Sequence, residues 1–330
     1  MEDFWGRREC GPRFRRSSHL FGWPVEVSSN RAESLQAVDV SLPLFSSASA
    51  IEAAALRVHI VARDMPFDPG PAPDDLFTRI QYSGHGNWLA LHLDAWGLAH
   101  VALDEGRALV VVAPSLAYDA HALSRFVLNT VFLNLLENRG FSLIHATSVI
   151  ANDRVLLLVG DHNSGKSTTA LRLALRGYDF VADSMVFIAP QLETLQLLGF
   201  PVGMAKVRGD MVQAFPDLAP LFERQITREE IKFGLDLRRL PAVTVRERAI
   251  VAPGAIDVFL VQRHEGGNSR VTPASQAKAY EALFHNSAYW HEAAFWRRHQ
   301  KQLRRLVRSA RCYHLALGSN IEGLLEAVGD

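Results

Sequence analysis

The feature that most constrains this chain is a glycine-framed loop between an apolar run and a helix-forming run. The loop matches the pattern G-x-x-x-x-G-K-[ST] in full, with the residues Gly160, Asp161, His162, Asn163, Ser164, Gly165, Lys166, Ser167 and Thr168. An apolar strand, Val155–Val159, enters the loop, and a helical run from Thr169 leaves it. Since both flanking elements are present, a chance match in a strand–turn–helix is the weaker alternative.

A loop of this kind predicts a phosphate site. Successive backbone N–H groups point inward at phosphate oxygens, and the helix N-terminus adds its positive end. We therefore expect a bound nucleoside triphosphate, ATP with Mg²⁺. Lys166 would reach its β- and γ-phosphates, and the Ser167 hydroxyl would ligate the magnesium ion.

Composition excludes several other classes of protein. The 330 residues carry 35 basic and 35 acidic side chains, so no overall field favours nucleic acid or a membrane surface. Two cysteines do not make a secreted disulfide framework, and the apolar segments are too short to cross a bilayer. With no signal-peptide pattern near Met1, we expect a cytoplasmic protein, and a homo-oligomer is left open.

The chain divides on pattern near residue 118. Residues 1–118 predict a smaller, β-rich N-terminal domain, with a loose Arg-rich tail over residues 1–17 that is either solvated or a docking arm for an acidic partner. The strands expected in this domain are Val25–Val27, Ala37–Leu42, Leu56–Ala62, Trp88–Leu93, His100–Leu103 and Leu109–Val112.

Residues 119–330 predict an α/β catalytic domain. A helix with Asp119 as its N-cap and Gly140 as its stop comes first. Residues 203–241 mix Gly, Pro and charge, which predicts a mobile excursion such as a lid. The other elements expected are strands at 142–150, 154–159, 180–182, 185–188, 256–261 and 313–317, and helices at 166–175, 288–310 and 321–328.

The run from His145 to Asp183 resembles the catalytic domain of HPr kinase/phosphorylase. It contains a His-bearing strand, the loop, a helix that ends in Arg176-Gly177, and a Val-Ala-Asp segment, and the close resemblance covers residues 144–188. The β-rich front half is similar to the HPr-kinase-related kinases of peptide biosynthetic clusters, including lasso-peptide kinases. The resemblance implies a PEP-carboxykinase-like P-loop fold with a mixed central sheet. It also implies phosphoryl transfer from ATP to a Ser/Thr hydroxyl of a peptide or protein.

Residue roles follow from the same resemblance. Lys166 and Ser167 keep their phosphate and metal roles, and Asp183 would face the metal or the acceptor hydroxyl. His145 would lie beside the carboxylate and tune it. Without the resemblance, an Asp at a strand end is an ordinary turn former, and a lone His in a strand is an ordinary structural residue.

Two positions depart from the family pattern. Ser184 stands where the family has a second Asp, and Lys206, in Lys206-Val-Arg208-Gly209, stands where it has a metal-binding Glu. These changes favour an anionic group over a metal ion, so Lys206 or Arg208 would clamp a phosphate or the acceptor. They also leave two alternatives open: a nucleotide-binding regulatory protein or pseudokinase, and a small-molecule kinase.

Residues 296–311 form a basic run with an apolar stripe at Leu303, Leu306 and Val307. The pattern predicts a solvated amphipathic helix, and a docking face for an acidic peptide is the alternative. RNA binding is disfavoured, because the total charge is neutral and no stacking motif accompanies the run.

Overall fold

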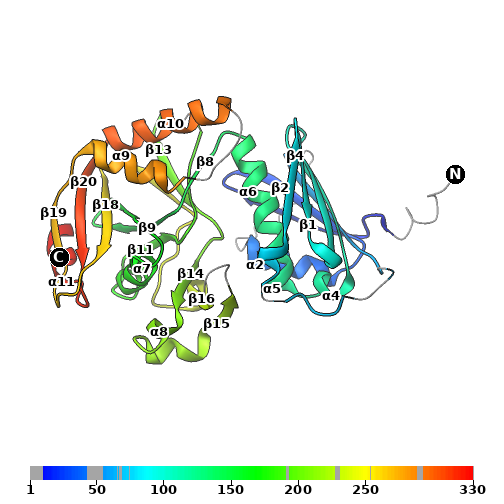
Figure 1. Ribbon diagram of the computed structural model, residues 1–330, viewed down its shortest axis with the longest axis horizontal. Coiled ribbons are helices and arrows are strands. Elements are labelled where there is room, and N and C mark those ends of the chain that lie inside the picture. Colours follow the sequence, from blue (N-terminus) through cyan, green and yellow to red (C-terminus); the bar gives the residue numbers. More distant parts are fainter. Residues whose placement is uncertain are drawn as a thin grey trace. The chain divides into compact units, whose positions relative to one another are not determined.

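The computed structural model describes residues 10–42, 55–64, 66, 69–73, 75–190, 193–226, 231–252, 254–287 and 293–329. The chain forms two compact units (Figure 1), residues 1–139 with 226–230 and residues 140–225 with 231–330. The architecture is mixed α/β, and its larger sheets combine parallel and antiparallel strands. None of the helices in the described ranges has the length and apolarity that crossing a bilayer requires.

The first unit is built on a seven-stranded sheet of order β1-β2-β3-β7-β6-β5-β4. The pairs β2–β3 and β3–β7 are parallel, and the other pairs are antiparallel. Its strands are β1 (Phe14–Leu20), β2 (Trp23–Ser29), β3 (Leu56–Ala62), β4 (Gln81–His85), β5 (Trp88–His92), β6 (Gly97–Ala102) and β7 (Arg107–Val112). Five of the six predicted strands are therefore confirmed, with ends shifted by up to three residues.

One prediction in this unit is wrong, and a second is wrong in part. The expected strand at Ala37–Leu42 is a helix, because Ala37, Val38 and Ser41 are buried together on one side of it. A short apolar run does not by itself distinguish the two periods. The expected loose tail is ordered from Phe14, where β1 begins and pairs with β2. Residues 1–9 lie outside the described residues.

The helical segment that follows β7 also belongs to the first unit. Asp119 accepts a hydrogen bond from the Ala122 backbone N–H at 2.9 Å, which confirms the N-cap, and Gly140 has a φ of +95° where the segment stops. The segment packs against α2, and the boundary between the two units follows Arg139. The domain boundary predicted from the sequence, near residue 118, would instead assign this segment to the second unit. The helices are η1 (Glu33–Leu35), α2 (Gln36–Ser41), α3 (Leu76–Arg79), η2 (Asp94–Trp96), α4 (Pro114–Ala117), α5 (Ala120–Leu123), the π-helical η3 (Ser124–Leu128) and α6 (Asn129–Asn138).

The second unit is layered around a six-stranded sheet of order β11-β9-β10-β18-β20-β19. β10 is parallel to β18, and β18 to β20, while β9 and β19 run antiparallel to their neighbours. The strands are β9 (Ala146–Ala151), β10 (Arg154–Val159), β11 (Asp179–Ala182), β18 (Ile256–Arg263), β19 (Arg270–Pro273) and β20 (Ala310–Leu317).

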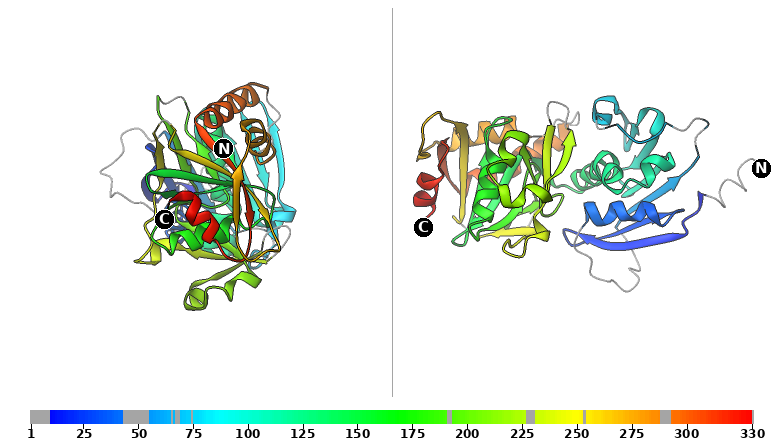
Figure 2. Two further views of the ribbon diagram at one scale, coloured as in Figure 1. Left: turned by 90° about the vertical axis from the view of Figure 1, so that its left-hand side faces the viewer. Right: turned by 90° about the horizontal axis from the view of Figure 1, so that it is seen from below.

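Both faces of β10 are buried, which explains its uninterrupted apolar sequence. Leu156 and Leu158 pack with α7 (Lys166–Ala174) and α11 (Glu322–Val328) in one cluster. Val155, Leu157 and Val159 pack in the other cluster, with α9 (Gln276–His285) and α10 (Ala293–Arg308). Figure 2 shows α9 and α10 together on one side of the sheet. The apolar stripe of α10 is therefore buried in the core, as in an ordinary amphipathic surface helix.

Two smaller sheets complete the unit. A four-stranded sheet of order β17-β13-β12-β8 packs into the same cluster as α9 and α10. A three-stranded sheet of order β14-β16-β15 packs into the cluster of α7 through Ala205, Val207 and Leu235. The remaining elements are β8 (Ser142–Ile144), β12 (Val186–Ile188), β13 (Leu195–Gly199), β14 (Met204–Arg208), α8 (Gly209–Val212), η4 (Pro216–Leu221), β15 (Glu223–Ile226), β16 (Ile231–Asp236), η5 (Leu237–Arg239) and β17 (Arg248–Val251).

The prediction of an irregular excursion over 203–241 is thus wrong in part. β14 and β16 pair in antiparallel register over five residues, and their apolar residues are buried. Pairing between strands more than twenty residues apart leaves little trace in local composition. The Gly, Pro and charged residues of this span therefore indicated an irregular segment, although two of its strands pair.

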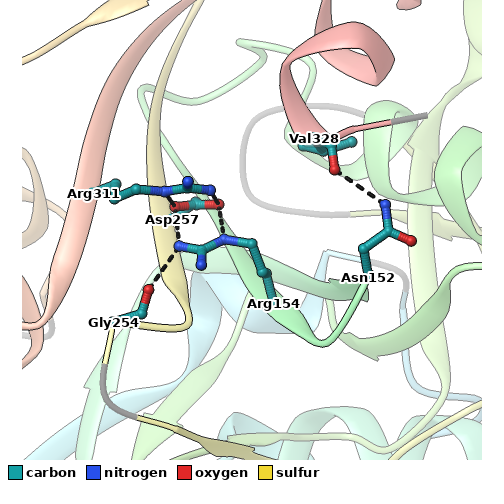
Figure 3. A network of polar contacts seen from close by, with 6 residues as sticks. All are labelled: Asn152, Arg154, Gly254, Asp257, Arg311 and Val328. Atoms are coloured by element: carbon teal, nitrogen blue, oxygen red, sulfur yellow. Dashed lines mark hydrogen bonds and ion pairs between the residues drawn. The ribbon is translucent and has the colours of Figure 1, made fainter.

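A buried ion network joins three strands at the ends opposite the glycine loop (Figure 3). Asp257 is 1% exposed and accepts two hydrogen bonds from each of Arg154 and Arg311, all at 2.7 Å. Burial alone would raise the pKa of the Asp257 carboxyl, but the hydrogen bonds from Arg311 and Arg154 outweigh it and hold that pKa below its usual value. The network therefore ties β10, β18 and β20 together.

We expect Asp257→Asn to lower the free energy of unfolding by about 3 kcal/mol, because it leaves two guanidinium groups without their carboxylate. Glu322→Gln is the matched control: it removes an exposed pair with Arg176 at 3.7 Å and should change stability by less than about 1 kcal/mol. Urea denaturation measures both. Because the folded-state pKa of Asp257 is depressed, its stabilisation is present above the ordinary aspartate pKa and is lost as pH falls through the depressed value. Equal effects of the two substitutions would contradict a structural role for the network.

Candidate nucleotide-phosphate site

The predicted loop lies between β10 and α7, as the sequence indicates. A Cβ on Gly160 would lie 2.4 Å from the Val261 carbonyl oxygen. Gly165 has a φ of +99°, and a Cβ there would lie 2.5 Å from a Leu317 methyl group. Gly160 is therefore required by the close approach of the Val261 backbone, and Gly165 by its left-handed conformation and by the Leu317 side chain. The tight turn directs the N-terminus of α7 into the loop.

Lys166 is folded over this loop. Its Nζ donates to the carbonyl oxygens of Gly160 and Asp161 at 2.8 Å each, and the residue is 5% exposed. Burial lowers the pKa of the Lys166 amine to about 8; Asp183 opposes this shift and Lys232 adds to it. Carbonyl oxygens thus hold a desolvated ammonium at the mouth of the loop, where a phosphate oxygen is a stronger acceptor.

Asp183 is a buried junction between three elements. Its Oδ1 accepts from the Thr147 hydroxyl of β9 at 2.8 Å and from the Ser167 hydroxyl of α7 at 2.6 Å. Its Oδ2 accepts from the Lys206 backbone N–H of β14 at 2.8 Å. The residue is 4% exposed. The structure thus brings Asp183 and Ser167 into contact, although sixteen positions separate them in the sequence.

His145 sits at the break between β8 and β9. Its Nδ1 lies 2.9 Å from the Ser184 carbonyl oxygen, and Ser184 has a φ of +69°. A carbonyl can only accept, so Nδ1 carries the proton and Nε2 carries the lone pair. Burial, followed by the charge of Lys166, lowers the pKa of the His145 imidazole to about 4. His145 is therefore a neutral ring with a fixed tautomer at pH 7.

These residues surround one solvent-open hollow of about 430 Å³, which we call the phosphate hollow. Five cationic side chains line it, and two of them, Lys232 and Arg263, were not identified in the sequence. Its lining is His145, His162, Asn163, Gly165, Lys166, Ser167, Thr168, Ser184, Lys206, Val207, Arg208, Lys232 and Arg263. The predicted site residues are thereby brought together, with Asp183 directly behind Ser167.

Three of the five cations lie on one face of the two-stranded ribbon formed by β14 and β16. Arg208 is directly opposite Lys232 in the β14–β16 pair, and Lys206 is two residues along the same strand, so all three side chains share a face. Like charges directly opposite each other are unfavourable, and Arg208 is also paired with Asp210 at 3.2 Å. An anion in the hollow would relieve this repulsion.

Of the two cations that the sequence analysis did not identify, Lys232 had no usable sequence signal and Arg263 had one. Lys232 lies on β16, inside the span that was expected to be irregular. Arg263 ends β18, which is parallel to β10. Because parallel strands present their carboxyl ends at one edge of a sheet, the position of Arg263 after the predicted strand at 256–261 was a usable signal.

The oxygens present suit a magnesium ion that arrives with a nucleotide. Ser167 Oγ and Asp183 Oδ1 lie 2.6 Å apart at the loop. Within the described ranges, no group of three or more His, Cys, Asp or Glu side chains could hold a metal by itself. Magnesium commonly binds through one carboxylate, waters and substrate phosphates, which is the set that this arrangement allows.

Comparisons with known proteins add little beyond this geometry. No protein-family model matches the sequence, and no curated protein matches it. Among solved structures, the chain is similar to the Hpr(Ser) kinase/phosphatase from Coxiella burnetii, with 15% identity over 40% of this chain and 72% of that chain, and a TM-score of 0.27.

We expect Gly165→Ala to weaken nucleotide binding at least about tenfold, because the added methyl group would meet the buried Leu317 side chain and one of the two must shift, in a loop that is already left-handed at this residue. Gly177→Ala is the control: Gly177 has a φ of +92° but meets nothing within 4 Å. That variant should lose about 1 kcal/mol of stability and keep its nucleotide affinity. Titration calorimetry with ATP separates the two. Unchanged affinity in Gly165→Ala would show that the loop conformation does not matter for binding.

Proposed function

We propose that this chain is an ATP-dependent kinase that transfers the γ-phosphate to a serine or threonine hydroxyl of a peptide or protein. The observation that carries the proposal is the continuous contact from the glycine loop through Ser167 to Asp183, inside a hollow lined by cations. In this proposal the second unit is a PEP-carboxykinase-like P-loop domain of the HPr-kinase-related type, preceded by the sheet of the first unit.

The donor side follows from the loop. The triphosphate would lie against the loop N–H groups and the start of α7, and Lys166 would exchange its two carbonyl partners for phosphate oxygens. Ser167 and Asp183 would hold magnesium, which supplies charge neutralisation for the transferring group. Lys206 and Arg208, with Lys232, would clamp the phosphate or the acceptor.

On the acceptor side, His145 is the residue placed to orient the hydroxyl group. Both Asp183 oxygens already accept hydrogen bonds, so this carboxylate is better placed to orient Ser167 than to receive a proton. The Nε2 lone pair of His145 belongs to a ring that lines the hollow. It can accept a hydrogen bond from the acceptor hydroxyl and orient it toward the γ-phosphorus. The loose transition state of phosphoryl transfer needs little proton removal before the bond to phosphorus forms.

A polypeptide acceptor fits the wall built by β14 and β16, which presents three cations along one ribbon face. The second candidate is a nucleotide-binding protein without phosphotransfer. Ser184 favours it, since this residue provides a hydroxyl where the family pattern has a second carboxylate.

The test is incubation with Mg-ATP and a panel of serine- and threonine-containing peptides, including any short peptide encoded next to this gene. Tandem mass spectrometry then locates added phosphate. We expect one phosphoserine or phosphothreonine with stoichiometric ADP. If ATP binds but is never consumed with any peptide, the second candidate is favoured.

We also expect His145→Gln to lower kcat for phosphotransfer about 100-fold and to leave ATP affinity within about twofold, because the ring orients the acceptor and not the donor. His285→Gln, at an exposed position on α9, is the control and should match the wild type. A fall in ATP affinity without a fall in kcat would assign His145 to the donor site instead.

A further inference from the structure

A second pocket opens beside the phosphate hollow, with about 630 Å³ of open space. We call it the side pocket. Its lining combines apolar side chains, Met211 and Leu317, with the hydroxyl-bearing residues Thr168 and Thr169 and two cationic residues, Arg172 and Arg263.

The two spaces share part of their lining. Gly165, Thr168 and Arg263 line both the phosphate hollow and the side pocket. A ligand whose charged end occupies the hollow would reach the side pocket past these shared residues.

The order of residues along α7 gives this ligand a direction. Lys166 and Ser167 line the phosphate hollow but not the side pocket. Thr168 lines both, while Thr169 and Arg172 line the side pocket but not the phosphate hollow. The most anionic end of the ligand thus belongs at Lys166, and the end farthest from it belongs beside Thr169.

The side pocket has the chemistry that a nucleoside requires. Met211, on α8, is half-buried, packs against the core cluster of α7 and lines the side pocket. Leu317 ends β20 and is buried against Gly165. Polarisable and aliphatic side chains of this kind pack well on the faces of aromatic rings.

Arg263 stands at the junction of the two spaces. It is exposed at the end of β18, and its guanidinium makes no hydrogen bond or ion pair with another residue in the part of the chain that the structure describes. A phosphate that links a nucleoside to the terminal phosphates would pass this point.

We propose that the side pocket holds the nucleoside of the bound nucleotide, with its base between Met211 and Leu317 and with Arg263 on the phosphate nearest the ribose. This inference rests on the proposed phosphate site, and it adds the part of the site that distinguishes a nucleotide from a bare polyphosphate.

The test compares two probes on the full chain by titration calorimetry: ATP, and inorganic tripolyphosphate, which has no nucleoside. In Met211→Ala we expect ATP affinity to fall about tenfold, because the base loses an apolar contact, while tripolyphosphate affinity changes less than about twofold. Val212→Ala is the matched control, since Val212 lies on the same short helix and packs against the same cluster but does not line the side pocket. It should leave both affinities unchanged.

Other outcomes overturn the inference. Equal losses for ATP and tripolyphosphate in Met211→Ala would mean that the substitution disturbs the loop and not a nucleoside contact. No loss for either probe would mean that the nucleoside lies elsewhere. If the wild-type chain binds neither ATP nor tripolyphosphate, the phosphate site is wrong, and the proposed function is wrong with it. If the wild type binds both probes and Met211→Ala binds ATP as tightly as the wild type does, only the side-pocket assignment is wrong.

Discussion

The candidate site depends on one buried carboxylate. Asp183 accepts hydrogen bonds from β9, α7 and β14, three elements that are far apart in the sequence. An ionised carboxylate at 4% exposure is unfavourable unless its oxygens are satisfied, and here three donors satisfy them. The same contacts fix Ser167 at the loop and hold the strand that carries Lys206 and Arg208 against the hollow. Asp183 therefore organises the site whether or not it also contacts a metal ion.

Around this carboxylate the balance of charge is positive. Five cationic side chains line the phosphate hollow, and His145 stays neutral because burial and Lys166 lower its pKa to about 4. Lys166 is held by carbonyl oxygens, and Arg208 faces Lys232 across the ribbon. Each of these arrangements becomes more favourable when a polyanion enters. The hollow therefore favours an anionic ligand over a neutral or cationic one.

Much of the second unit could be predicted from the sequence because its signals are local. The glycine loop, the strand at 154–159 and the helix from Lys166 appear where the pattern predicts them. The contact of Asp183 with Ser167 depends on strand pairing, and no spacing rule predicts it. Only the family resemblance pointed to Asp183 and His145 as neighbours of the loop. Lys232 was missed because β16 is a strand through its pairing with β14 and not through its composition. The helix α2 was misread because six residues that mix apolar and polar side chains are too few to distinguish a helical from a strand period.

The central claim is that the loop binds a nucleoside triphosphate through its phosphates, and calorimetric titration of the purified chain with Mg-ATP tests it most directly. The wild type should bind saturably with one site per chain. Lys166→Ala should bind about 10- to 100-fold more weakly, since it loses a charge-assisted contact to phosphate. Lys301→Ala, which removes an exposed lysine of α10, should not differ from the wild type. Equal affinity in the wild type and Lys166→Ala, or no binding to either, would contradict the account.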